Sequence, residues 1–193
     1  MTTNLVHIYW YLSRAAGFAA FGLLWLSMVY GLLITNRMAR MWPGGPTAFD
    51  LHQFTSLLAL VFTGFHMLVL LGDSYLSYSL VQLLVPFGST NYEPVWVGLG
   101  QIGFYVMALV SITFYLRNRM KSGAWRVVHY LSFGSFVMAL GHGLLSGSDT
   151  GAWWASGLYW LAGMSTLFLT VYRILVRNVA LPPAKQAQAI ARS

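Results

Sequence analysis

Five stretches of this chain are long and apolar enough to cross a lipid bilayer, and they take up most of its 193 residues. A transmembrane helix needs about 20 mostly apolar residues. Five stretches meet this requirement: Ile8–Thr35, Ala48–Gly72, Val95–Leu116, Val127–Leu145 and Ala152–Tyr172. Only 8% of the residues are charged, against about 25% in a soluble domain. The sequence therefore predicts an all-α, polytopic membrane helix bundle with five transmembrane helices, and excludes an ordinary soluble or disordered chain.

A sixth apolar stretch, from Tyr78 to Phe87, is too short to span a membrane and is interrupted by Pro86. We expect this segment to lie at the membrane surface. The five spans belong to one domain, residues 1–177, and the polar residues 178–193 form a short tail after it. Pro182 and Pro183 are expected to prevent the last helix from continuing into that tail.

The basic residues are distributed very unevenly between the two ends of this predicted bundle. Arg14 is the only one at the end where the first helix begins. The other ten lie at the opposite end: Arg37, Arg40, Arg117, Arg119, Lys121, Arg126, Arg173, Arg177, Lys185 and Arg192. Because Lys and Arg favour cytoplasmic loops, we expect the N-terminus outside and the C-terminus in the cytoplasm. The net charge of +7 is thus a topology signal, and it gives no support to nucleic-acid binding.

The chain contains no cysteine, which excludes disulfides, a cysteine nucleophile, cysteine-ligated iron–sulfur clusters and covalent heme attachment. Gly98, Gly100 and Gly103 spell the G-x-G-x-x-G pattern of dinucleotide-binding folds. That pattern needs a preceding strand and a following acidic residue, whereas here it opens a membrane span. We therefore interpret these glycines as sites of close helix packing.

Four of the five histidines lie inside predicted spans, where ionisable residues are rare and usually functional. His52 and His66 are 14 residues apart on the second helix, and His129 and His142 are 13 apart on the fourth. At 1.5 Å per residue these separations are about 21 Å and 20 Å. Both helices run from inside to outside, so His52 lies at the depth of His129, and His66 at the depth of His142.

Two facing pairs of imidazoles at two depths suit two bis-histidine b-type hemes stacked across the membrane. Helical phase puts His52 and His66 on one face but sets His129 and His142 about 140° apart in an ideal helix. Glycines in the fourth helix are one way to absorb that difference. The alternative is that the histidines only form hydrogen bonds between helices. His7, at the outer interface, is expected to have no such role.

Arg14 lies about two turns into the first helix, on the outer side. One interpretation is that its side chain extends to the lipid headgroups. The other is that it pairs with an outer-heme propionate or with an anionic electron acceptor. The sequence leaves both open.

Several segments resemble the ferric reductase-like transmembrane domain family over residues 13–172. They are Leu51-His52 with His66, Arg126-Val-Val-His129-Tyr130 with His142, Ser146-Gly-Ser-Asp149, and Ser13-Arg14-Ala-Ala-Gly17. That family includes the membrane part of NADPH oxidases and ferric reductases, and the heme subunit of the bacterial methionine sulfoxide reductase system. The resemblance implies that His52 and His129 ligate an inner heme, His66 and His142 an outer heme, and that Arg14 lies near the outer one.

The resemblance also implies a function: electron transfer through heme b from a cytoplasmic flavoprotein or quinol donor to an acceptor outside. We expect an oxidoreductase subunit of the bacterial cytoplasmic membrane that depends on a separate reductase. The larger relatives carry a cytoplasmic flavin and nicotinamide domain, for which this sequence has no room. FAD and NAD(P)H are therefore expected only through a partner. Many relatives also have a sixth span before these five.

Two other classes of function stay open at this point. One is a non-catalytic membrane anchor or assembly subunit of a larger complex. The other is an ion or proton transporter that uses its intramembrane histidines. A proton pathway normally also needs buried carboxylates, and the acidic residues Asp50, Asp73, Glu93 and Asp149 all lie at the ends of predicted spans.

Overall fold

The protein is a bundle of five long helices with one short helix at its edge, as seen in a computed structural model describing residues 2–74, 76–90 and 92–179. The long helices are α1 (Thr2–Thr35), α2 (Gly45–Val69), α4 (Pro94–Leu116), α5 (Ser122–Ser146) and α6 (Trp153–Val179). Each is long and apolar enough to span a membrane. The prediction of an all-α bundle with five spans is confirmed.

The shorter elements connect these helices. They are α3 (Leu80–Leu84) and three single turns of 3-10 helix, η1 (Met38–Arg40), η2 (Leu70–Gly72) and η3 (Arg117–Arg119). Proline stands in the first turn of α2 and is the first residue of α4, where its missing N–H removes no helical hydrogen bond. Arg37 adopts a left-handed conformation, with φ of 62°, where the chain leaves α1.

The helices run longer than their apolar stretches predict. Helix α5 begins at Ser122 rather than Val127, and α6 continues to Val179 rather than ending at Tyr172. Polar residues at a helix end keep the helical hydrogen bonds but fall outside a hydropathy window. The predicted tail of residues 178–193 lies outside the described residues, except for its first two, which extend α6.

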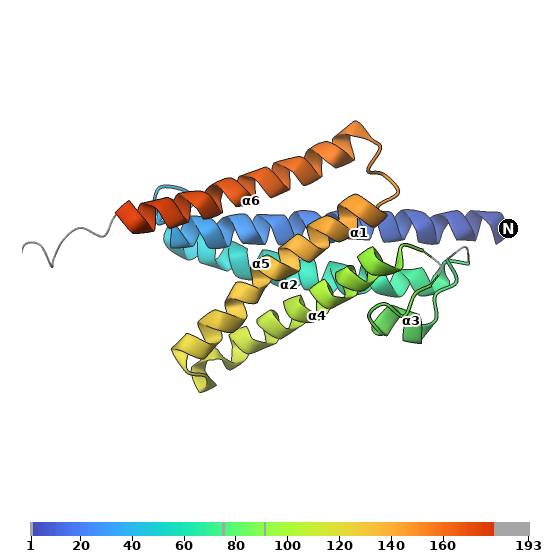
Figure 1. Ribbon diagram of the computed structural model, residues 1–193, viewed down its shortest axis with the longest axis horizontal. Coiled ribbons are helices and arrows are strands. Elements are labelled where there is room, and N and C mark those ends of the chain that lie inside the picture. Colours follow the sequence, from blue (N-terminus) through green and yellow to red (C-terminus); the bar gives the residue numbers. More distant parts are fainter. Residues whose placement is uncertain (1, 75, 91, 180–193) are drawn as a thin grey trace, which may run out of the picture.

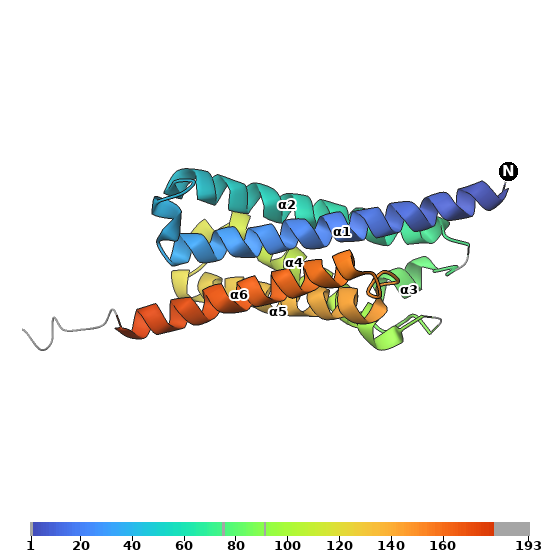
Figure 2. The same ribbon diagram turned by 90° about the horizontal axis from the view of Figure 1, so that it is seen from above.

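Helices α1 and α2 pack against each other along most of their length, and α4 and α5 form a second antiparallel hairpin. Helix α1 also contacts α6, so it lies between α2 and α6, as Figure 2 shows. Helix α5 crosses the α1–α2 hairpin obliquely (Figure 1). The two hairpins therefore face each other closely at one end of the bundle and separate towards the other.

The bundle interior is small, and large apolar side chains cover the outside. A buried cluster of Phe21, Met28, Phe136, Tyr159 and Ala162 joins α1, α5 and α6. Many other large apolar side chains, especially on α6, are more than half exposed. In a lipid environment such an exterior is expected, because helices there associate through packing and hydrogen bonds rather than by removing apolar surface from water.

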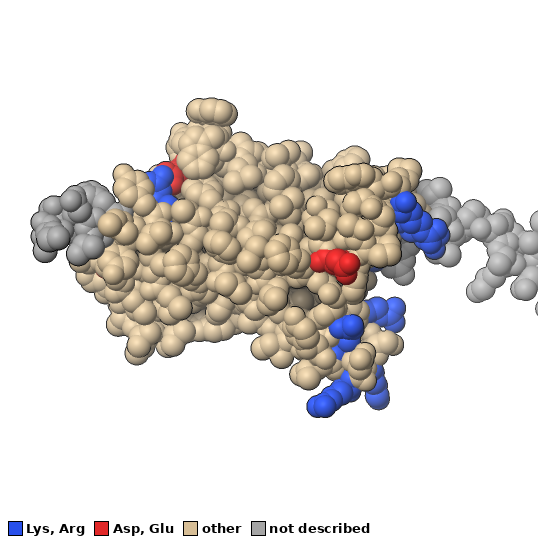
Figure 3. Space-filling view, turned by 180° about the vertical axis from the view of Figure 1, so that it is seen from behind, with Lys and Arg blue, Asp and Glu red and all other residues tan. Residues whose placement is uncertain are grey.

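Basic side chains gather at the end where the α4–α5 turn and the end of α6 lie (Figure 3). We call this the basic end, and the other the N-terminal end, because α1 begins there (Figure 1). The predicted separation of charge between the two ends is thus present among the described side chains, and Lys185, Arg192 and the side chain of Arg177 lie outside the described residues.

Helix α3 lies at the N-terminal end, beside α4 (Figure 1). Its N-terminus has a capping box between Ser79 and Gln82. Its last carbonyl groups accept hydrogen bonds from α4: Gln101 Nε2 donates to Gln82 O and Leu83 O, both at 2.7 Å, and the Tyr105 hydroxyl donates to Leu84 O. Side chains of α4 thus satisfy the carbonyls that a helix end leaves free. The segment Tyr78–Phe87 does not form a sixth span.

Candidate functional site

The four histidines of the predicted spans form two facing pairs. His52 of α2 lies opposite His129 of α5, with ring centroids 6.1 Å apart. His66 of α2 lies opposite His142 of α5, with centroids 6.3 Å apart. In both pairs the ring planes are nearly perpendicular, at 81° and 74°. The structure brings together the same histidines that the sequence predicted to pair. We call them the basic-end pair and the N-terminal-end pair.

The helical phase of α5 does not prevent this pairing. His129 and His142 lie on different faces of an unbroken helix that runs from Ser122 to Ser146. Helix α5 crosses the α1–α2 hairpin obliquely (Figure 1), and residues on different faces of an obliquely crossing helix can meet the same neighbouring helix at different depths. Distortion at the glycines of α5, one of the expected explanations, is not needed.

The separation within each pair fits a single metal ion between two imidazoles. Imidazole nitrogen bonds transition metals at about 2.0–2.1 Å. The centre of the ring lies roughly 1.2 Å from each ring atom, given bonds of about 1.3–1.4 Å. Two imidazoles on opposite sides of one metal ion therefore have centroids about 6.4–6.6 Å apart. The 6.3 Å of the N-terminal-end pair is close to this range, and the 6.1 Å of the basic-end pair is slightly below it.

Helix α1 orients both histidines of α2 by the same arrangement, used twice. The Nδ1–H of His66 donates to Ser13 O at 2.8 Å, and the Nδ1–H of His52 donates to Ser27 O at 2.9 Å. One turn beyond each serine stands a glycine. A Cβ at Gly17 would lie 3.2 Å from Nδ1 of His66, and one at Gly31 would lie 3.3 Å from Cε1 of His52.

This arrangement leaves Nε2 as the ring nitrogen with a free lone pair. A carbonyl oxygen only accepts hydrogen bonds, so Nδ1 must carry the proton. Metal-binding histidines commonly donate their other N–H to a backbone carbonyl, which fixes the tautomer and the ring orientation. Both histidines of α2 are therefore prepared to ligate a metal through Nε2.

The sequence analysis named Ser13 and Gly17 only within a segment that carries a family resemblance, and it missed Ser27, Gly31 and the role of all four beside the histidines, although the sequence contains a signal for them. Ser13-x-x-x-Gly17 recurs as Ser27-x-x-x-Gly31, at the 14-residue spacing that separates the two histidines of α2. A search for a helix carrying the same spacing as the histidines would have found this repeat.

Helix α4 orients His142 by the same two kinds of contact, a backbone carbonyl and a glycine. The Nδ1–H of His142 donates to Trp96 O at 3.0 Å. One turn on, a Cβ at Gly100 would lie 2.8 Å from the same nitrogen. Gly98 and Gly103 are also packing sites, against Phe87 and against α5 near Ser135 and Met138. The interpretation of these three glycines as close-packing positions is confirmed.

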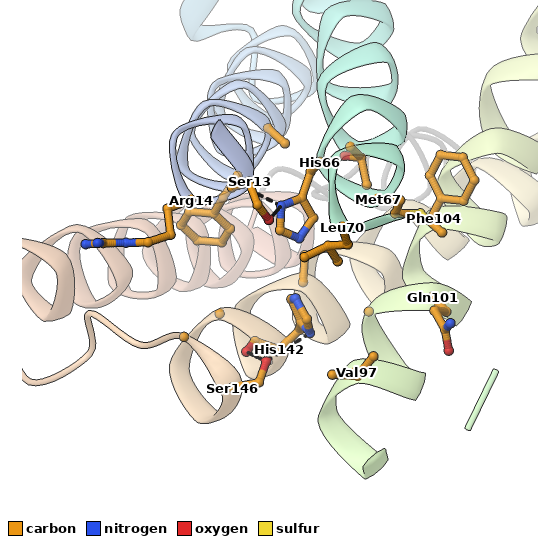
Figure 4. A pocket seen from close by; sticks show the side chains of 18 of the residues that line it. Ser13, Arg14, His66, Met67, Leu70, Val97, Gln101, Phe104, His142 and Ser146 are labelled. Carbon is orange, nitrogen blue, oxygen red and sulfur yellow. Dashed lines mark hydrogen bonds between the residues drawn. The ribbon is translucent and has the colours of Figure 1, made fainter. Parts of the chain in front are cut away.

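A cavity of about 350 Å³ surrounds the N-terminal-end pair. Figure 4 shows the rings of His66 and His142 facing each other in its middle, with Arg14 on one side and Gln101 on the other. Most of its remaining walls are apolar, with Phe18, Phe21 and Phe104 among them. A planar macrocycle centred between two axial ligands needs space on both sides of them, and this cavity provides it.

The basic-end pair encloses much less space. The cavity beside His52 and His129 measures about 50 Å³, and Met28 and Met107 form part of its wall. Methionine side chains are flexible and change shape readily. A macrocycle at this pair requires these side chains to move, so the N-terminal-end site is the better formed of the two.

Arg14 has a partner that the sequence did not indicate. Its Nε donates a hydrogen bond to Oδ2 of Asp149 at 2.6 Å, and its Nη2 forms an ion pair with Oδ1 of the same residue. The guanidinium carbon also lies 3.9 Å from the centre of the Trp10 ring. Arg14 lines the large cavity, but its charge is already paired within the chain. His7 lies in the first turns of α1, and its side chain is outside the described residues.

Within the described residues, no group of three or more His, Asp or Glu side chains is arranged to hold a bare metal ion. The donors come in pairs, and a pair is enough only where another group supplies the remaining ligands, as a porphyrin does. Comparisons with protein-family models, curated proteins and solved structures found no match to this chain. The candidate site therefore has to be judged on its geometry alone.

Proposed function

We propose that this protein carries electrons across a membrane through two b-type hemes, one at each histidine pair. The observation that supports this most directly is the separation of the paired rings, 6.1 and 6.3 Å, which suits two axial imidazoles on one iron. When bound, each heme supplies an iron that accepts and releases one electron. The protein supplies the ligands, their orientation and an apolar enclosure.

The chain's own residues have two roles in this proposal, as ligands of the heme iron and as supports that orient those ligands. His52, His66, His129 and His142 are the axial ligands in this proposal, and α1 and α4 hold three of their rings in place. A heme held by two of these imidazoles would have no free position on its iron for oxygen, which would favour electron transfer over oxygen chemistry.

The electron donor in this proposal acts at the basic end, which we assign to the cytoplasm. A flavoprotein with an acidic surface suits the Arg117, Arg119, Lys121 and Arg126 side chains of the α4–α5 turn, and quinol is the other donor considered. The protein is then an oxidoreductase subunit of a bacterial cytoplasmic membrane, and FAD or NAD(P)H belongs to its partner.

A proton or ion transporter is less well supported. Among the described spans, the carboxylate side chains are confined to the first turns of α2, where Asp50 lies. The histidine rings with hydrogen bonds at Nδ1 are also held by backbone carbonyls, an arrangement that suits fixed ligands better than groups that take up and release protons.

Heme content tests the proposal first. The protein is purified in detergent from cells supplied with heme, and reduced-minus-oxidised spectra and the heme-to-chain ratio are recorded. We expect a b-type spectrum with about two hemes per chain. A colourless protein rejects the proposal, and one heme per chain limits it to the N-terminal-end site.

Electron transfer is then tested in liposomes that contain trapped ferricyanide, with dithionite added outside. We expect the native protein to accelerate ferricyanide reduction. The His66→Ala protein and empty liposomes serve as controls, and equal rates in all three samples reject the electron-transfer role.

A further inference from the structure

One of the four paired histidines lacks the support that the other three share. His52, His66 and His142 each donate Nδ1–H to a backbone carbonyl of a neighbouring helix and lie against a glycine of that helix. Within the described residues, neither a hydrogen bond to the His129 ring nor a glycine against it is present. This ring therefore needs another source of orientation.

The ring of His129 is instead stacked on Trp125. The two ring centroids are 5.1 Å apart and the planes are 21° from parallel. Trp125 precedes His129 by four residues on α5, so one turn of helix places the indole beside the imidazole. Both side chains are half-buried. The contact lies towards the basic end of the bundle, where Val110 and Ser111 of α4 line the same cavity as His129.

Resting on the heme function proposed above, we propose that Trp125 is the positioning residue of the basic-end site, holding the imidazole plane of His129 by stacking. The indole has no contact with the space between His52 and His129 and ligates nothing. It limits rotation of the His129 ring, a task that a carbonyl and a glycine perform for the other three. The stacked ring of His129 stands nearly perpendicular to the ring of His52, at 81°.

Membrane-interface anchoring is the other explanation for a tryptophan at this depth. Trp42 lies at the same end and is 71% exposed, as an interfacial anchor should be. Trp125 is half-buried and stacked on a site residue. The two tryptophans therefore separate the two explanations experimentally.

The test compares Trp125→Leu, Trp125→Phe and Trp42→Leu in the full-length, heme-loaded protein. The readouts are the heme-to-chain ratio and the low-spin ferric electron paramagnetic resonance spectrum, whose largest g value depends on the angle between the axial ring planes. We expect Trp125→Leu to weaken heme binding at the basic-end site about tenfold, as loss of a ligand's supporting partner commonly does. Any heme still bound there should give a broadened signal, and the signal of the N-terminal-end heme should not change.

Trp125→Phe keeps an aromatic face and should restore both the occupancy and the signal. Trp42→Leu should resemble the native protein in both. The proposal is overturned if Trp125→Leu leaves occupancy and signal native, or if Trp42→Leu has the same effect as Trp125→Leu. The proposal is also overturned if Trp125→Leu loses the resonance signals of both hemes and Trp125→Phe loses them as well. That result would indicate a general folding role for Trp125. Absence of heme from the native protein instead rejects the proposed function on which this inference rests.

Discussion

Gly17 of α1 and His66 of α2 lie so close that one added carbon atom would press on the ring: a Cβ at Gly17 would lie 3.2 Å from Nδ1 of His66, so the ring would have to move by a few tenths of an ångström. The same relationship joins Gly31 to His52 at 3.3 Å. Glycine is used in both places because the backbone of one helix approaches a ring held by the next.

Gly17→Ala should therefore weaken heme binding at the N-terminal-end site, by about tenfold, because the added methyl group displaces the ring of His66. Gly31→Ala should do the same at the basic-end site. Gly22→Ala is the matched control, because nothing lies within 4 Å of a Cβ at that position. Heme-to-chain ratios of the three variants check this.

Reduced stability does not account for such an effect. Alanine is favoured over glycine inside a helix by about 1 kcal/mol, so Gly22→Ala should preserve or raise the melting temperature, and in Gly17→Ala and Gly31→Ala the same preference offsets the cost of moving the histidine ring. Full heme content in Gly17→Ala would contradict the contact.

Removing a ligand should empty one site and spare the other. We expect His66→Ala and His142→Ala to lose the N-terminal-end heme and keep the basic-end heme. His52→Ala and His129→Ala should do the reverse, because the two pairs are about 20 Å apart along their helices. Heme-to-chain ratios and redox titrations measure this. Loss of both hemes from a variant that still folds would show that the pairing is wrong.

The ion pair between Arg14 and Asp149 should stabilise the N-terminal end. Its side chains are 27% and 16% exposed, so the pair is intermediate between a surface and a buried salt bridge. A double-mutant cycle with Arg14→Gln and Asp149→Asn should give a coupling free energy of about 1–3 kcal/mol in thermal unfolding. A coupling near zero would mean that the pair does not join α1 to the α5–α6 connection.

The same variants decide whether Arg14 also acts on a heme. If the arginine serves only to pair with Asp149, both single variants should keep the N-terminal-end heme equally well. If Arg14→Gln alone loses that heme, the arginine also has a role towards a propionate.

The absence of cysteine makes the membrane orientation easy to measure. A single cysteine is placed at Asn118, in the α4–α5 turn, and another at Ser74, after η2, in separate proteins. We expect an impermeant maleimide to label Ser74→Cys, but not Asn118→Cys, in intact cells. Labelling of Asn118→Cys but not of Ser74→Cys would show that the assigned orientation in the membrane is wrong.

The fold was largely predictable from sequence because a membrane span is a local signal. Twenty apolar residues in a row indicate a helix whatever they contact, and one end of the bundle collects nearly all the basic residues. The pairing of histidines was also accessible, because α2 and α5 cross the membrane in the same direction and their residues can be assigned a depth by counting from the helix ends.

Contacts between side chains on distant segments were not accessible. Arg14 and Asp149 are 135 positions apart, and nothing local to either one indicates the other. The carbonyl groups that orient His52, His66 and His142 belong to neighbouring helices, and no feature local to these histidines indicates them.

The two Ser-x-x-x-Gly segments of α1 each contact one histidine of α2, so the number of residues between the two segments cannot change without moving one of them out of contact. Each additional residue turns a helix by about 100°, so inserting or deleting one residue between Gly17 and Gly31 would face one glycine towards lipid and leave its histidine against a side chain. The connection between α2 and α4 does not hold two sites at a fixed helical spacing. Changes of length during evolution should therefore accumulate around α3 and be absent from the middle of α1.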